Sequence, residues 1–80
     1  MTILERIDRL VDHWCGERHL DALRIILPTW PIAMNLTDEW ARVFESLKAV
    51  RERAAVDFTA AETKELEDVI LEVGRVVYRS

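Results

Sequence analysis

Apolar residues recur along this chain every three or four positions, the spacing that places them on one face of an α-helix. In residues 3–15 they keep to an arc of roughly 140°, taking 100° per residue, and in 38–54 and 60–78 to arcs of roughly 110° and 120°. The shorter segment 17–27 is apolar on nearly all sides. No window alternates with period two, so the pattern predicts helices and no strands.

Capping signals support these boundaries. Thr2 followed by Glu5, and Thr59 followed by Glu62, match the capping box, in which hydroxyl and carboxylate each accept from a backbone N–H of the first turn. Gly16 predicts a left-handed residue at the end of the first helix. The third helix is expected to begin near residue 37, where a threonine can act as N-cap.

The predicted fold is therefore all-α. We expect one domain over residues 1–80, a small irregular four-helix bundle with helices at about 3–15, 17–27, 38–54 and 60–78. Because the last two helices are long and are joined by a short turn at 55–58, they should form an antiparallel hairpin.

Two prolines interrupt the longest uncharged run of the chain. Proline lacks an amide hydrogen and disfavours the helical conformation of the residue before it, so Pro28 should end the second helix at Leu27. The same argument at Pro31 predicts an extended Pro-Trp-Pro connector over 28–36 that holds Trp30. Two roles follow for this indole.

In the first role, Trp30 closes the open end of the bundle. In the second, it forms an exposed anchor for a partner together with Ile32 and Met34, because Trp and Met are over-represented at the centres of interfaces.

A second stripe runs along the last helix. Leu71, Gly74 and Tyr78 lie roughly 80–140° around the helix from Leu66, outside the main apolar arc. Glycine inside a helix costs about 1 kcal/mol relative to alanine, so a packing reason is expected at Gly74. Gly74 would allow another helix to pack closely, either residues 3–15 of the same chain or a helix of a second copy in a two-fold dimer.

Composition and charge exclude several classes of partner. The chain has 80 residues and a net charge of −4, spread evenly, so it lacks the basic stripe that nucleic acid binding requires. No apolar run approaches the roughly 20 residues that span a bilayer. Cys15 is the one cysteine, and charged residues fill the N-terminal segment where a secretory signal is apolar. We therefore expect a cytoplasmic protein.

Candidate chemistry is sparse. His13, Cys15 and His19 are residue types that bind zinc, but His13 and Cys15 diverge by about 200° on a helix, and paired ligand doublets are missing. A Cys15–His19 nucleophilic pair lacks an orienting third group and a glycine-rich elbow. These residues therefore predict no metal ligand and no catalytic group.

The acids of the last helix give the same answer. Glu62, Glu65 and Glu72 lie opposite the apolar stripe and should face water, and no Glu-x-x-His motif accompanies them. We accordingly expect no cofactor.

The sequence thus favours a non-enzymatic module for protein–protein interaction or self-association, including a possible homodimer. Its binding residues would be Trp30, Ile32, Met34, Leu71, Gly74 and Tyr78. Two alternatives stay open: a small acidic inhibitor or immunity-type protein that masks a basic surface, and a regulator that binds a small molecule or metal in a pocket beside the Trp30 segment.

Overall fold

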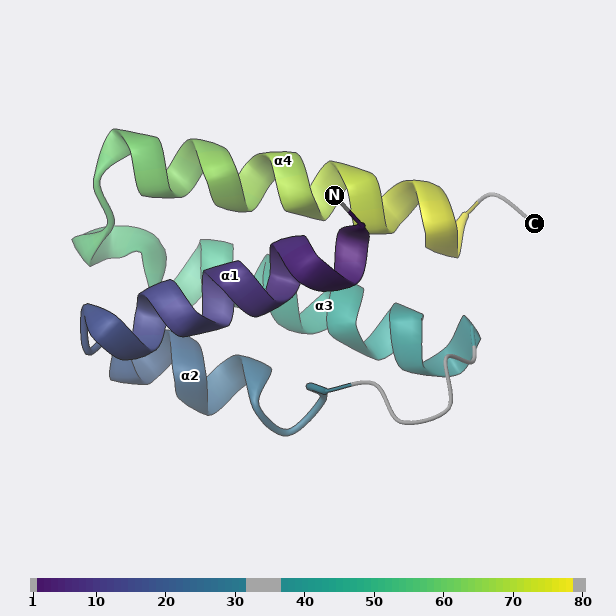
Figure 1. The fold of residues 1–80 in the computed structure, drawn as a ribbon, viewed down its shortest axis with the longest axis horizontal. Coiled ribbons are helices and arrows are strands. Elements are labelled where there is room, and N and C mark those ends of the chain that lie inside the picture. Colours follow the sequence, from purple (N-terminus) through teal and green to yellow (C-terminus); the bar gives the residue numbers. More distant parts are fainter. Residues whose placement is uncertain (1, 32–36, 79–80) are drawn as a thin grey trace.

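The computed structural model describes residues 2–31 and 37–78 of the protein. In these residues the chain forms four α-helices and one short 3₁₀ turn, with no strand, which confirms the predicted all-α bundle (Figure 1). The elements are α1 (Ile3–Gly16), α2 (Leu20–Ile26), α3 (Thr37–Arg53), η1 (Ala55–Asp57) and α4 (Ala60–Val77).

The helices pack as a ring. α3 and α4 run antiparallel through η1, as expected, and α1 and α2 complete the bundle (Figure 1). α1 packs against α2 and α4, and α2 packs against α3. Each helix therefore has two neighbours, and the four apolar stripes meet in a single core.

Every helix contributes fully buried side chains to this core. Trp14 of α1 is the largest of them. The buried residues of α4 are spaced three and four positions apart, as expected for one face of a helix. The largest fully buried side chains in the described residues are Ile7, Trp14, Ile26, Val43, Leu47, Val50, Leu66, Val69 and Val73. The predicted faces of α1, α3 and α4 are thus the faces that the fold buries, except that Leu4 and Cys15 of α1 are exposed.

The second helix is shorter than the sequence suggests. It was expected over 17–27, yet α2 has seven residues. Its apolar residues Ala22 and Ile26 are buried, whereas Leu20 and the neighbouring Leu27 are exposed. The cause lies in the preceding turn, which occupies three of the residues assigned to the helix.

In that turn the left-handed residue is not the glycine that was expected. Gly16 is the last residue of α1 and is not left-handed; Arg18 is, with a φ of 58°. The N–H of Arg18 donates to the carbonyl of Cys15 (3.2 Å) and that of His19 to the carbonyl of Trp14 (2.9 Å). These two bonds are the pair that defines a Schellman motif, here with arginine at the left-handed position.

The connector also begins differently. Leu27 keeps helical dihedrals, φ −60° and ψ −33°, although Pro28 follows it. The N–H of Thr29 donates to the carbonyl of Ile26 (3.0 Å) and that of Trp30 to the carbonyl of Leu27 (3.3 Å). Continued hydrogen bonding therefore outweighs the steric bias before proline, and the chain turns where an extended segment was expected. Residues 32–36, with Ile32 and Met34, lie outside the described residues.

Trp30 is a core side chain. Only 8% of it is exposed, and its indole Nε1–H donates a hydrogen bond of 3.1 Å to Oδ1 of Asp8 on α1. A buried indole normally needs such a partner for its N–H. This burial favours the first expected role of Trp30, closing the core, over the role of an exposed anchor.

Replacing Trp30 tests that role. We expect Trp30→Ala to lower the free energy of unfolding by about 3–5 kcal/mol, because it removes a buried aromatic side chain and leaves a cavity. Leu27→Ala, at an exposed position three residues earlier, should cost less than about 1 kcal/mol. Urea unfolding followed by far-UV circular dichroism measures both. Equal effects of the two substitutions would contradict the assignment of Trp30 to the core.

Candidate functional site

Two adjacent hollows follow the outer seam between α3 and α4. The first has a volume of about 780 Å³ and is lined by Phe44, Ile70, Leu71, Gly74, Arg75 and Tyr78. The second, of about 540 Å³, is lined by Lys48, Arg51, Glu52, Glu67, Ile70 and Leu71. Because Ile70 and Leu71 line both, the hollows form one continuous depression, called here the α3–α4 groove.

The stripe predicted on the last helix lies in this groove. Leu71 and Tyr78 are 63% and 71% exposed, and Gly74 lines the wall between them. Leu71 and Tyr78 extend into solvent, whereas Gly74 faces the ring of Phe44 on α3. The structure therefore brings Leu71, Gly74 and Tyr78 together on one surface, and separates them from the buried Trp30.

Gly74 is explained by a residue that the sequence reasoning missed. A Cβ atom built at Gly74 would lie 3.1 Å from Cε1 of Phe44, which is closer than such contacts normally come. The close neighbour within the chain is thus a side chain of α3, and not residues 3–15, which were one of the two alternatives considered. Phe44 gave no separate signal, because it belongs to the regular apolar arc of its own helix.

Phe44 forms the floor of the groove. Its ring meets that of Tyr78 edge-to-face, with centroids 5.6 Å apart and an interplanar angle of 84°. The ammonium of Lys48 lies 4.8 Å from the centroid of the same ring. An exposed tyrosine is thereby held against a buried phenylalanine, which gives the groove an ordered aromatic end.

Charges of both signs lie along the rim. Arg51 Nε donates to Oε2 of Glu67 across the seam, at 2.9 Å. Arg75 lines the opposite end of the groove and makes no ion pair within the described part of the chain. The rim therefore carries two ion-paired bases, Lys48 and Arg51, and the paired acid Glu67. Within the described residues, Glu52 and Arg75 add an acid and a base without an ion pair.

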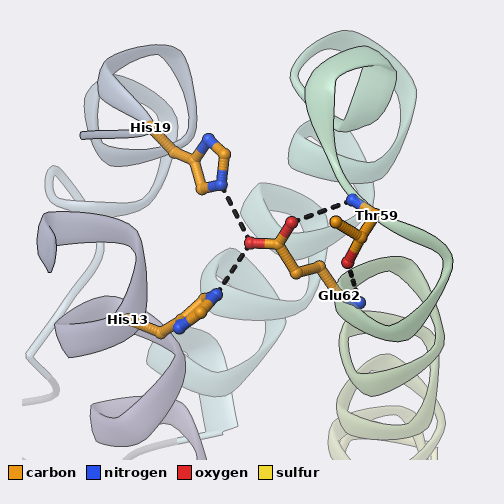
Figure 2. A network of polar contacts seen from close by, with 4 residues as sticks. All are labelled: His13, His19, Thr59 and Glu62. Atoms are coloured by element: carbon orange, nitrogen blue, oxygen red, sulfur yellow. Dashed lines mark hydrogen bonds and ion pairs between the residues drawn. The ribbon is translucent and has the colours of Figure 1, made fainter. Parts of the chain in front are cut away.

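A polar cluster lies at the other end of α4. Glu62 and Thr59 form the complete capping box predicted there: the N–H of Thr59 donates to Oε1 of Glu62 (2.8 Å), and the N–H of Glu62 donates to Oγ1 of Thr59 (3.1 Å). Figure 2 shows that the second carboxylate oxygen, Oε2, points between two imidazoles. Nε2 of His13 lies 2.7 Å from it, and Nε2 of His19 lies 2.9 Å from it.

The expectation that the acids of α4 face water is wrong for this residue. Only 15% of the Glu62 side chain is exposed, because α1 presents His13 to it and the Schellman turn presents His19. Glu65 and Glu72 also have a partner, since both accept from the guanidinium of Arg6 on α1. No local pattern signals these pairs, because the partners come from the other end of the chain.

Glu62 is held in its ionised form. The backbone hydrogen bond from Thr59 is the largest cause that lowers the pKa of its carboxyl, from 4.5 to about 2. The hydrogen bonds to His19 and His13 act in the same direction, against the opposing effect of burial. The carboxylate therefore fastens the first turn of α4 to the end of α1 and the start of α2.

The cluster offers little for chemistry. Among residues 2–31 and 37–78, no group of three His, Cys, Asp or Glu side chains could hold a metal ion. Cys15 is exposed, and His19 directs Nε2 at Glu62. The adjacent pocket between α1 and α4 has a volume of about 250 Å³, below the roughly 300–1,000 Å³ of typical ligand sites. We infer that the cluster has a structural role, holding the first turn of α4 to α1 and to the turn before α2.

Comparison with known proteins adds no relative. No protein-family model matches the chain, and neither curated proteins nor solved structures give a match. In the part of the chain that the structure describes, no helix is both long and apolar enough to cross a membrane. The geometry of the α3–α4 groove is therefore the feature that bears on function.

The lowered pKa of Glu62 predicts a specific loss of stability in acid. A carboxyl whose pKa is lower in the folded state contributes stability above its unfolded pKa, near 4.5, and this is lost as the pH falls towards about 2. We expect Glu62→Gln to reduce the free energy of unfolding at pH 5 by about 1–2 kcal/mol. The difference from wild type should shrink between pH 5 and pH 2.

Urea unfolding at a series of pH values measures this difference. Asp68→Asn is the control, because Asp68 is an exposed carboxylate of the same helix with no hydrogen bond or ion pair in the described structure. Its curve should run parallel to that of wild type. If Glu62→Gln stays less stable than wild type by the same free energy of unfolding down to the lowest pH, the ionised role of Glu62 is contradicted.

Proposed function

We propose that the protein is a non-enzymatic interaction module whose α3–α4 groove binds a helix of another protein molecule. The observation that carries this proposal is the exposure of Leu71 (63%) and Tyr78 (71%) on either side of Gly74, along a groove with an aromatic floor. Large apolar side chains gathered in a concave surface are typical of protein-binding sites.

The dimensions of the groove fit a helix. Its lining on α4 runs from Glu67 to Tyr78, which at 1.5 Å per residue spans about 16 Å, or three turns of a helix. An amphipathic helix docks in such grooves through apolar residues three and four positions apart.

Binding would proceed by removing apolar surface from water. Leu71, Tyr78 and the exposed edge of Phe44 would supply the buried centre, and the charged rim would select the orientation of the bound helix. Trp30 supports this surface only indirectly, as part of the core. A contribution of Ile32 and Met34 stays a prediction.

The two alternatives find less support. Glu65, Glu67 and Glu72 each pair with an arginine of the same chain, which reduces the free acidic surface that an inhibitor of a basic partner would need. A small-molecule regulator was expected to bind beside the Trp30 segment, but Trp30 lines neither hollow of the α3–α4 groove nor the pocket between α1 and α4. We also propose a cytoplasmic location, because the exposed free thiol of Cys15 is typical of a reducing compartment.

Site-specific photo-crosslinking in the native host cells tests the proposal. A benzophenone amino acid is placed at position 71 or 78, and at position 56 as control, because Val56 is 86% exposed on η1, away from the groove. We expect protein adducts from positions 71 and 78 and none from position 56.

Adding Leu71→Asp to the chain that carries the crosslinker at position 78 should abolish its adduct, since a charge would enter the apolar centre. The mass of an adduct shows whether the bound molecule is foreign or a second copy. Adduct yields at positions 71 and 78 no higher than at position 56 would refute the interaction module.

A further inference from the structure

The two charged residues that α4 contributes to the groove are placed symmetrically about Leu71. Glu67 stands four residues before it and Arg75 four residues after it, and both line the groove with Leu71. On a helix these two positions lie within about 40° of Leu71, on either side. The stripe therefore reads acid, apolar, base in one direction, and base, apolar, acid in the other.

This order is self-complementary for an antiparallel pair of helices. If two copies of α4 cross with Leu71 opposite Leu71, then Glu67 of each copy faces Arg75 of the other. A two-fold axis requires this reciprocity, because residue i contacts j and j contacts i. The symmetric contact would contain two acid–base pairs and no facing pair of like charge at these positions.

We propose that the occupant of the α3–α4 groove is a second copy of this chain, with α4 packed antiparallel on α4 about a two-fold axis beside Leu71. This inference rests on the proposed function and names its partner. A foreign helix would need the same order of charges by coincidence, whereas a second copy supplies it by symmetry.

The side chains needed for the contact are accessible. Arg75 is exposed and has no ion pair in the described part of the chain. Glu67 holds Arg51 through Oε2 alone, and about half of its side chain is exposed. Its other oxygen, Oε1, can therefore accept a hydrogen bond from Arg75 of the second copy while the pair with Arg51 is kept.

The apolar part of the contact is also suited to close approach. Leu71, at the axis, would pack against its own counterpart, above the hollow that Phe44 and Gly74 line. Tyr78 stands seven residues after Leu71, and Lys64 seven residues before it. The ring of each copy would thus lie near the ammonium of the other, a favourable contact for an aromatic face.

Sedimentation equilibrium of charge-reversal variants tests this arrangement. The wild-type chain should show a reversible monomer–dimer equilibrium. Glu67→Arg alone and Arg75→Glu alone should each raise the dissociation constant by about tenfold or more, because two pairs of like charges then face each other.

Mixing the two variants supplies the decisive measurement. In a mixed dimer the arginine introduced at position 67 of one chain faces the glutamate introduced at position 75 of the other, and the native pair remains on the opposite side. The equimolar mixture should therefore associate about as tightly as wild type. The chain carrying both substitutions should do the same.

Controls come from charges outside the groove. Asp12 on α1 and Arg24 on α2 are exposed and have no ion pair in the described structure. Asp12→Arg and Arg24→Glu should leave the dissociation constant unchanged. Far-UV circular dichroism of every variant verifies that each chain is folded.

The possible failures are distinct. A wild-type chain that stays monomeric at every concentration overturns the second copy as occupant, and so does a mixture that does not recover association. The interaction module itself would survive such a result if the crosslinkers at positions 71 and 78 captured a foreign protein. If the crosslinkers captured no protein at all, both the interaction module and the second copy as its partner would be refuted.

Discussion

The packing of α3 against α4 is the constraint on which the rest of the structure depends. Phe44 fits against the α4 backbone because position 74 has no side chain, and this contact sets how closely the two long helices approach. One side of the hairpin then meets α1 and α2 to form the core, and its outer seam is left as a groove. A single glycine thus shapes both the interior and the surface that we assign to binding.

The two ends of α4 serve different purposes. Its first turn is fastened to the rest of the bundle by a charged carboxylate at Glu62, with imidazoles from α1 and from the turn before α2. Its last turns carry Leu71 and Tyr78 into solvent. The same helix is therefore anchored by polar contacts at one end and presents exposed apolar side chains at the other.

The sequence predicted what is local and missed what is not. The four helices, their buried faces and the Thr59–Glu62 capping box follow from spacing within one segment, so they could be predicted. At Thr2 the box is only half formed, since the Glu5 carboxylate accepts from the Thr2 hydroxyl. The left-handed residue at the end of α1 is Arg18 and not Gly16 as expected, because the hydrogen bonds of the Schellman turn place it there. The stripe of Leu71, Gly74 and Tyr78 was visible, but its neighbour Phe44 depends on tertiary packing.

The dual use of Glu62 has a consequence for how this protein opens. A capping box normally concerns one helix, but here its carboxylate also binds residues 43 and 49 positions earlier in the chain. Fraying of the first turn of α4 would release both imidazoles, and separation of α1 and α2 would in turn weaken that turn. Local opening at this end is therefore cooperative, and the amide hydrogens of three helix ends should exchange with solvent as one unit.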